Sequence, residues 1–349
     1  MLNKIKKNIR VLIVDDSAVV RKVLTRELSR YDGIEVVGTA VDPYVARDKI
    51  VSLKPDVITL DLEMPRMDGL TFLSKLMKYF PVPVIVLSSL TPKNSSTALK
   101  ALQLGAVDVL AKPGSSYSTK NVSEDLARAI YTASFVDVKV NTSLPETATP
   151  VNTNKRLLEK TTHKVVAIGA STGGTKAVEV VLRGFPASFP GVVVVQHMPE
   201  KFTATFAQRL NDVCSMEVRE AKSNDLVVPG QVLIAPGNYH TIMVGHGGEY
   251  MVKLKGGPRV HFQRPSVDVM FNSVASSAGK NAVGVILTGM GADGAQGLLR
   301  MRESGSRTLA QDEKTCVVFG MPKEAIKIKA VEKIIPLHQM ASEVAKVLH

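Results

Sequence analysis

The sequence predicts an α/β protein with two doubly wound parallel sheets joined by a linker. Short runs of β-branched residues alternate with amphipathic stretches early in the chain, and the same alternation returns in its second half. Between them, residues 140–154 are rich in Thr, Asn and Pro and almost free of large apolar side chains, as in a linker. Since 349 residues suit two domains, we expect a first domain at 8–128, a helix remainder and flexible linker at 129–160, and a second domain at 161–349.

The first domain contains four expected strands and a well-marked first helix. The strands are the runs VLIV (11–14), DVITL (56–60), VPVIVLS (82–88) and the short stretch 107–111. Between Ser17 and Leu28 the apolar residues fall on one helical face, and Ser17 can cap that helix.

Polar residues follow these strands at one predicted edge of the sheet. They are Asp15, Asp16, Asp61, Ser88 and Lys112. Any one of them alone would be read as an ordinary loop residue, but five in register point to a site. Three carboxylates suit Mg²⁺, the hydroxyl and the lysine suit phosphoryl oxygens, and Asp61 is then the nucleophile that forms an aspartyl-phosphate.

Four sequence strings make residues 8–128 resemble the receiver domain of bacterial response regulators. They are V-D-D-S (14–17), D-L-E-M-P-x-M-D-G (61–69), L-S-S-L-T (87–91) and G-A-x-D-x-x-x-K-P (105–113). The resemblance implies a flavodoxin-like fold and a histidine kinase as phosphodonor.

The resemblance also implies roles for individual residues. Asp61 accepts the phosphoryl group, and Asp15 and Asp16 bind Mg²⁺ with the backbone carbonyl of Glu63. Ser88 contacts the phosphoryl group and Lys112 pairs with it. A cis peptide bond is implied before Pro113, while Val109 departs from the pattern because receivers usually carry Tyr or Phe there.

The second domain contains a serine in the sequence context of a nucleophile. Strands are expected in KVVAIGA, GVVVVQH, QVLIAPG and AVGVILTG. The string G-A-S-T-G-G (169–174) lies between the first of these strands and a helix expected at 175–182. It contains the G-x-S-x-G pattern in which a tight turn lifts the serine, here Ser171, clear of the sheet.

A serine nucleophile needs a base and an orienting acid, and the strand ends indicate which residues these are. His197 directly follows GVVVVQ at the same edge as Ser171, and Asp293 lies just past VGVIL. Asp268 and Asp312 are weaker candidates because neither follows a clear buried strand. The other histidines lie at the opposite edge, in turns or loops, or in the C-terminal tail: His163, His240, His246, His261, His338 and His349.

Placed after a receiver, this domain is similar to the chemotaxis protein-glutamate methylesterases, the CheB family. The strings that carry the similarity are A-I-G-A-S-T-G-G, V-V-V-Q-H-M-P, I-A-P-G-N-Y-H, R-P-S-V-D-V-M-F, L-T-G-M-G-x-D-G and V-F-G-M-P. The similarity implies a Rossmann-like serine hydrolase that acts on methylated glutamates of chemoreceptor helices and deamidates glutamines, with no cofactor for the ester chemistry.

The same similarity implies which residues carry the reaction. Ser171 attacks the ester, His197 moves the proton, and Asp293 holds the imidazole. The backbone N–H of Met290 helps to stabilise the oxyanion, and Thr172 and Arg264 line the cleft.

Composition limits the other function classes. The net charge of +12 is spread evenly, +5 in residues 1–128 and +6 in residues 161–349, with no basic tail and no recognition helix, so we expect no nucleic-acid partner. The chain has two cysteines and no long apolar segment, so we expect a cytoplasmic protein that does not insert into a membrane. Because the sequence contains no coiled coil that would favour a dimer, we expect a monomer. The alternative hypothesis is a response regulator whose output domain only binds a partner, with Ser171 as a helix cap.

Overall fold

The computed structural model of the chain describes residues 8–89, 91–112, 119–136, 138, 163–246 and 248–348. The chain divides into two compact units, Met1–Ser143 and Leu144–His349. The expected linker at 140–154, the bond before Pro113 and His349 lie outside the described residues.

The first unit is a five-stranded parallel sheet in the order β2-β1-β3-β4-β5, which is the flavodoxin-like order that the sequence predicts. Its strands are β1 (Ile9–Val14), β2 (Ile34–Ala40), β3 (Val57–Asp61), β4 (Val84–Ser88) and β5 (Asp108–Ala111). Its helices are α1 (Ala18–Leu28), α2 (Pro43–Leu53), α3 (Gly69–Tyr79), α4 (Pro92–Gln103) and α5 (Thr119–Ala133).

Local signals explain where these elements begin. Every residue of the central strands β3 and β4 is buried, as expected for strands covered on both faces. The side chain of Ser17 accepts a hydrogen bond from the N–H of Val20, so it caps α1 as predicted. Asp42 and Asp68 cap α2 and α3 in the same way.

The second unit is a seven-stranded parallel sheet in the order β14-β13-β12-β6-β7-β9-β8, with a separate antiparallel hairpin of β10 and β11. Its strands are β6 (Val165–Ala170), β7 (Gly191–Gln196), β8 (Glu217–Glu220), β9 (Gln231–Ile234), β10 (His240–His246), β11 (Glu249–Lys255), β12 (Ala282–Ile286), β13 (Arg307–Gln311) and β14 (Lys333–Ile335). Its α-helices are α7 (Gly174–Arg183), α8 (Phe202–Val213), α9 (Val267–Ala278), α10 (Ala295–Glu303), α11 (Met321–Lys327) and α12 (Met340–Val347).

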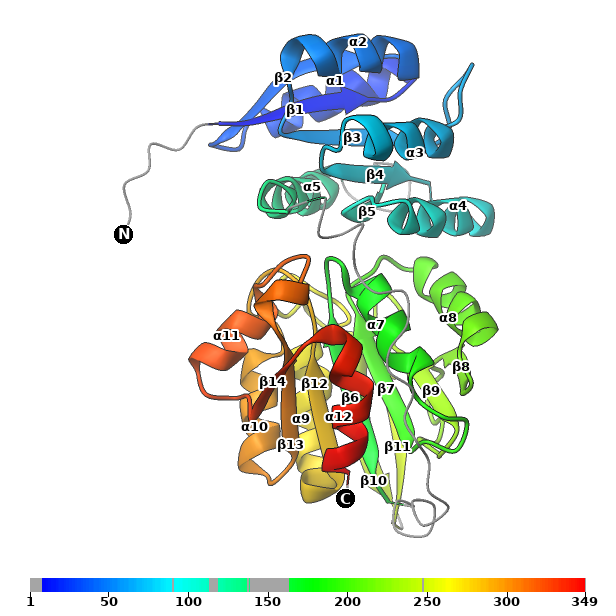
Figure 1. Cartoon of the computed structure of the whole chain (residues 1–349), viewed down its shortest axis with the longest axis vertical. Helices are drawn as coiled ribbons and strands as arrows, with labels where there is room; N and C mark the ends of the chain where they lie inside the picture. The colour runs from blue at the N-terminus through cyan, green and yellow to red at the C-terminus, as the bar shows by residue number, and fades with distance from the viewer. Residues whose placement is uncertain are drawn as a thin grey trace. The chain divides into compact units, whose positions relative to one another are not determined.

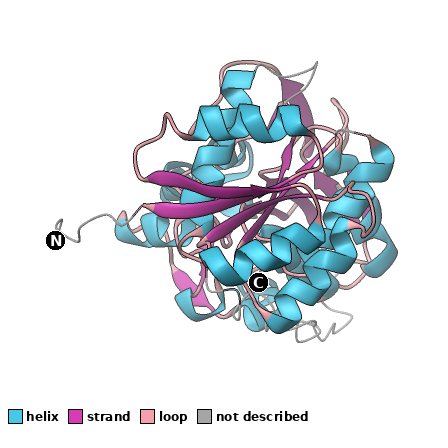
Figure 2. Cartoon of the chain, turned by 90° about the horizontal axis from the view of Figure 1, so that it is seen from above, coloured by secondary structure: helices cyan, strands magenta, loops and turns pink. Residues whose placement is uncertain are grey.

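Helices cover both faces of this sheet. The helices α7, α8 and α12 lie on one face, and α9, α10 and α11 lie on the other (Figure 1). Figure 2, which colours the chain by secondary structure, shows helices on both sides of the strands in view. The order of the strands reverses at β6, which pairs with β7 on one side and with β12 on the other. In an open α/β sheet the ligand crevice forms at the carboxyl ends of the strands at such a reversal.

The structure corrects two details of the sequence analysis. His240 is the first residue of strand β10 and not a loop residue. Asp312 directly follows the mostly buried strand β13, and its side chain caps the short 3-10 helix Glu313–Thr315. Among the described residues, no helix is both long and apolar enough to cross a membrane.

Candidate functional site

The first candidate site lies at the carboxyl edge of the sheet in the first unit. Asp15 follows β1 and is fully buried, Asp61 ends β3 and is 1% exposed, and Asp16 is open to solvent. One carboxylate oxygen from each residue lies within 4.8 Å of the other two. The structure thus brings the predicted ligands together, and this all-oxygen set with one open side fits Mg²⁺.

Ser88 ends β4, the neighbour of β3, and Lys112 directly follows β5, the next strand in the sheet. Ser88 is the last residue of β4, and its carbonyl accepts a hydrogen bond from the N–H of Lys112 at 2.9 Å. The Lys112 Nζ lies 2.6 Å from Asp61 Oδ2 and 3.1 Å from Asp15 Oδ2. The Ser88 hydroxyl lies 3.4 Å from the carbonyl oxygen of Asn94, in the first turn of α4.

The charges in this site shift each other's ionisation. Burial raises the pKa of Asp61, with a smaller contribution from the negative charge of Asp15, and the hydrogen bond from Lys112 offsets only part of the rise. Burial would lower the pKa of Lys112, but its contacts with Asp61 and Asp15 outweigh burial and raise it. The lysine therefore stays positively charged beside carboxylates that repel each other.

The structure also describes Glu63 and Val109, two further positions of this unit that the sequence analysis named. The N–H of Glu63 donates to Asp61 Oδ1 at 3.0 Å, while the Glu63 side chain is exposed. Val109 is a buried residue of β5. The position that is aromatic in most receivers therefore carries a small, packed side chain here.

The second candidate site lies where β6, β7 and β12 end. Ala170 and Gln196 are register partners, and the N–H of His197 donates to the carbonyl of Ala170 at 3.0 Å. Ser171 therefore begins the loop next to His197, and its own N–H donates to the carbonyl of Thr288 at 3.0 Å. The two predicted residues thus lie at adjacent strand ends.

Glycines make the turn after Ser171 possible. Gly173 has a φ of +77°, and a Cβ there would come within 2.6 Å of the Val317 side chain. A Cβ on Gly174 would lie 2.1 Å from Oε1 of Gln196, whose amide nitrogen donates to the carbonyl oxygens of Ser171 and His197 at 2.9 and 3.0 Å. The buried side chain of Gln196 therefore holds the turn through these hydrogen bonds.

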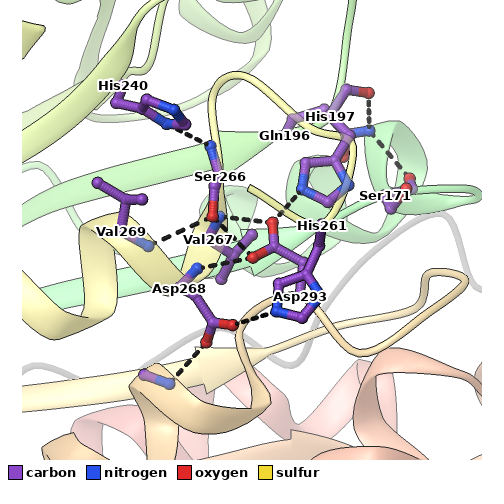
Figure 3. Close-up of polar contacts among 11 residues, drawn as sticks. Ser171, Gln196, His197, His240, His261, Ser266, Val267, Asp268, Val269 and Asp293 are labelled. Atoms are coloured by element: carbon purple, nitrogen blue, oxygen red, sulfur yellow. Dashed lines mark hydrogen bonds and ion pairs between the residues drawn. The ribbon is translucent and has the colours of Figure 1, made fainter. Parts of the chain in front are cut away.

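His197 is joined to the predicted acid. Its Nε2 lies 2.7 Å from Asp293 Oδ2, and the imidazole is 5% exposed (Figure 3). Its Nδ1 is buried and has no hydrogen-bond partner among the described residues. The Ser171 hydroxyl and the imidazole do not form a hydrogen bond within the described part of the chain, and such bonds often tighten only when substrate binds.

Asp293 is held by the N-terminus of α9. Its Oδ1 accepts hydrogen bonds from the Ser266 hydroxyl at 2.8 Å and from the N–H of Asp268 at 3.0 Å. Its Oδ2 accepts from the N–H of Val267 at 2.8 Å in addition to His197. The positive end of the helix dipole adds to these four donors.

These contacts keep Asp293 ionised in a buried place. Burial alone would raise the pKa of Asp293, but the hydrogen bond and charge of His197, with the Asp268 N–H and the Ser266 hydroxyl, outweigh it and lower the pKa. An anionic carboxylate holds Nε2 of His197 in its protonated form. The free nitrogen, Nδ1, is then the one that can accept a proton.

The glycine-rich turn after β12 packs directly against the serine. A Cβ on Gly289 would lie 2.7 Å from Cβ of Ser171, so only glycine allows this approach. The next residue, Met290, is exposed, and none of the hydrogen bonds among the described residues engages its N–H. The predicted oxyanion donor thus lies one residue from the point of contact with Ser171.

The two predicted cleft residues make structural contacts. Thr172 is buried, and its carbonyl accepts a hydrogen bond from the Thr288 hydroxyl. The Arg264 guanidinium donates to the side-chain oxygen of Asn238 and to the carbonyl of Gly257. It therefore holds two loops together.

A second histidine–aspartate pair adjoins the first and was missed by sequence reasoning. His261 Nε2 lies 3.0 Å from Asp268 Oδ2, and the other Asp268 oxygen accepts the N–H of Gly297 at 2.6 Å. The only sequence signal was the R-P-S-V-D string itself. Burial raises the pKa of Asp268, and the charge of Asp293 raises it further, against the effect of Gly297 and His261.

His261, Asp268 and Asp293 also offer ligand atoms within 4.8 Å of one another. Asp293 already accepts four hydrogen bonds, which use its lone pairs. A metal ion bound by Asp293 would have to displace one of these four donors. We therefore assign this group to the positioning of Asp293 and not to a metal site.

Comparison with known families adds the following matches. The CheB methylesterase model matches residues 166–344, and the response regulator receiver domain model matches residues 11–121. A solved structure, the catalytic domain of Thermotoga maritima CheB methylesterase, aligns with a TM-score of 0.52 at 36% identity, covering 53% of this chain and 98% of that chain.

Two relatives are similar over nearly their whole length. The protein-glutamate methylesterase/protein-glutamine glutaminase 2 of Syntrophus aciditrophicus (strain SB) is 58% identical over 341 residues, 97% of this chain and 99% of that protein. The protein-glutamate methylesterase/protein-glutamine glutaminase 4 of Anaeromyxobacter dehalogenans (strain 2CP-C) is 56% identical over 343 residues, 97% of this chain and 95% of that protein.

Proposed function

Because this chain belongs to the CheB methylesterase family and carries a response regulator receiver domain before its catalytic domain, we propose that it is a phosphorylation-activated serine hydrolase. Its substrates are glutamate methyl esters on the cytoplasmic helices of chemoreceptors, and it also deamidates glutamines there. The observation that carries the chemistry is the His197–Asp293 pair beside Ser171 at adjacent strand ends.

The first half-reaction transfers the glutamyl group to the enzyme. The Ser171 hydroxyl attacks the ester carbonyl carbon, and its proton passes to Nδ1 of His197, the nitrogen that Asp293 leaves free. The carbonyl oxygen becomes an oxyanion near the N–H of Met290. Collapse of this intermediate breaks the bond to the methoxy oxygen, which takes the proton from His197 and leaves as methanol.

The second half-reaction releases the product. Water attacks the glutamyl ester of Ser171, His197 takes a proton from the water, and the same proton returns to Ser171 as the bond to the glutamyl carbon breaks. A free glutamate side chain results. With glutamine as substrate the leaving group is ammonia, and the later steps are the same.

The receiver supplies the regulation in this proposal. Asp61 accepts a phosphoryl group from a histidine kinase, with Lys112 paired to it and Ser88 in contact. Asp15, Asp16 and Asp61, with the backbone carbonyl of Glu63, would hold Mg²⁺, which supplies positive charge for the phosphoryl oxygens. We place the protein in the cytoplasm as a monomer, with no nucleic-acid partner and no membrane insertion.

Two measurements test the proposed activity. Membranes that contain methylated chemoreceptors should release methanol when the wild-type protein is added, and the Ser171→Ala variant should release none. A fluorophosphonate probe should label the wild type at Ser171 and fail to label the variant. Equal labelling of the two proteins would overturn the assignment of Ser171 as the catalytic nucleophile.

A further inference from the structure

Two sequence strings of the second unit contribute no residue to the reaction steps described above. They are I-A-P-G-N-Y-H, which ends at His240, and R-P-S-V-D-V-M-F, which contains Ser266. The structure joins them behind the site, because His240 is buried at 5% exposure and contacts the backbone at Ser266 (Figure 3).

The partners of His240 fix one form of its imidazole. Nε2 lies 2.9 Å from the carbonyl oxygen of Pro258, which can only accept, so this nitrogen carries the hydrogen. Nδ1 lies 3.3 Å from the backbone nitrogen of Ser266, whose N–H can only donate, so this nitrogen carries none. The surroundings therefore select the neutral imidazole with its hydrogen on Nε2.

Ser266 connects this imidazole to the acid of the site. Its hydroxyl donates to Asp293 Oδ1 at 2.8 Å and also accepts the N–H of Val269, so Ser266 caps α9. The next two N–H groups, those of Val267 and Asp268, donate to the same carboxylate. A shift of the Ser266 backbone would therefore re-aim three of the four donors on Asp293.

We propose that His240 is a positioning residue for the His197–Asp293 pair. Its unprotonated Nδ1 holds the backbone of Ser266, and Ser266 with the start of α9 holds Asp293 against Nε2 of His197. His240 itself touches neither substrate nor the reacting atoms. The kinetic part of the test rests on the proposed esterase function, and the spectroscopic part does not.

Two conservative substitutions distinguish the hydrogen-bonding roles of the two ring nitrogens of His240. In His240→Asn the side-chain oxygen takes about the place of Nδ1, so the acceptor for Ser266 is kept and the bond to Pro258 is lost. In His240→Gln the amide nitrogen takes about the place of Nε2, so the bond to Pro258 is kept and the acceptor for Ser266 is lost. If His240 only anchors the Pro258 segment, His240→Gln should keep more activity than His240→Asn. If His240 positions Ser266, His240→Asn should keep more activity than His240→Gln.

The first readout is turnover in the full chain. We expect His240→Gln and His240→Ala to lose about tenfold in kcat with KM nearly unchanged, which corresponds to about 1.4 kcal/mol, because a hydrogen bond that orients a catalytic group is lost. His240→Asn should stay within about threefold of the wild type. The control is His163→Asn, because His163 is exposed and, within the described part of the chain, its side chain bonds to the Gly248 carbonyl alone. Its activity should be unchanged.

The second readout is the proton shared by His197 and Asp293, seen by NMR as a resonance downfield of the amide region. Asp293→Asn should remove it and so assigns it. We expect His240→Asn to keep this resonance and His240→Gln to lose or shift it. If both variants keep it unchanged, or if Gln retains more turnover than Asn, His240 does not position Asp293. If the resonances behave as expected but no protein hydrolyses esters, the proposed function fails and the positioning role stands.

Discussion

Asp293 and Asp268 are buried carboxylates on neighbouring segments, yet their surroundings move their pKa values in opposite directions. Four donors, with His197 foremost, overcome burial and lower the pKa of Asp293. Burial and the charge of Asp293 prevail at Asp268 and raise its pKa. Two acids whose pKa values are pushed apart have different roles. Asp293 suits the orientation of an imidazole, and Asp268 packs the start of α9 against Gly297.

Asp293→Asn should lower kcat by about a thousandfold to ten-thousandfold while KM stays nearly unchanged and the variant still folds, with a modestly lower melting temperature. An amide cannot hold His197 with its hydrogen on Nε2, but it fills the same space. Steady-state kinetics on a small methyl ester and a thermal melt check this. A variant that keeps more than about a tenth of wild-type kcat would remove Asp293 from the triad.

His197→Ala and Ser171→Ala should each lose about as much activity as the double variant, because members of a triad act as a unit. His240→Ala should lose much less than either. Initial rates of methanol release measure all four proteins. If the losses of His197→Ala and Ser171→Ala were additive, the two residues would act in separate steps.

Acid should remove stability that depends on Asp293. A carboxyl whose pKa is lowered on folding contributes stability that is fully present above its unfolded pKa, which is about 3.9, and is lost as the pH falls through the lower folded value. Denaturant unfolding of the wild type and Asp293→Asn at several pH values tests this. The difference in unfolding free energy should be constant above about pH 5 and should shrink below about pH 4. A difference in unfolding free energy that does not vary with pH would mean that ionisation of Asp293 contributes nothing to stability.

At the scale of elements, the sequence predicted the strands that are continuous apolar runs. VVAIGA and GVVVVQ became β6 and β7 because strands covered on both faces are apolar throughout. The hairpin of β10 and β11 was missed, since β11 is only partly buried and mixes charged with apolar residues. Asp312 was misjudged for a similar reason, because β13, RTLAQ, begins and ends with polar residues.

The elements that hold Asp293 could not be predicted from the sequence. Ser266 was visible as a helix-cap residue type, but its contact with Asp293 spans 27 positions along the chain and depends on how α9 meets the loop after β12. The contact of Gln196 with the carbonyl of Ser171 depends likewise on the pairing of β6 with β7. The strand ends that are visible in the sequence predict which residues lie near one another. The individual hydrogen bonds among those residues depend on tertiary packing, which the sequence does not show directly.

The turn that presents Ser171 yields a prediction at this scale. Gly173→Ala combines a positive φ with overlap against Val317, so it should destabilise the second unit by about 1–3 kcal/mol and reduce esterase activity. Two controls separate the causes. Gly248→Ala has a φ of +88° but open space, so it should show the backbone strain alone, and Gly256→Ala has open space without a positive φ and should be neutral. Chemical denaturation measures all three, and equal effects at Gly173 and Gly248 would mean that the contact with Val317 costs nothing.

At the scale of the whole molecule, the two sites were predictable for one shared reason. Each gathers residues from several strands at the carboxyl edge of a parallel sheet, and alternating apolar runs mark where those strands end. The regulation of the second site by the first cannot be predicted in this way, because no short sequence motif indicates it. It has to be argued from what phosphorylation changes locally.

Phosphorylation of Asp61 adds close to two negative charges beside Lys112 and Ser88. Lys112 would shift toward the new charge from its present pairing with Asp15 and Asp61, and the Ser88 hydroxyl would leave the Asn94 carbonyl in the first turn of α4. With Val109 packed in the place of the usual aromatic residue, Ser88 and α4 are the route that remains for the change. We therefore expect Ser88→Ala to blunt activation by phosphorylation.

If the unphosphorylated receiver inhibits the catalytic unit, the fragment 155–349 should hydrolyse methyl esters faster than the whole unphosphorylated chain. A small phosphodonor with Mg²⁺ should raise the rate of the whole chain toward that of the fragment and leave the fragment unchanged. Asp61→Asn should hold the whole chain at its low rate, because no phosphoryl group can form, whereas Ser88→Ala accepts the phosphoryl group but responds less. Esterase rates of the four proteins with and without phosphodonor decide this. A whole chain as active as the fragment, and unaffected by the phosphodonor, would show that the receiver does not restrain the catalytic unit.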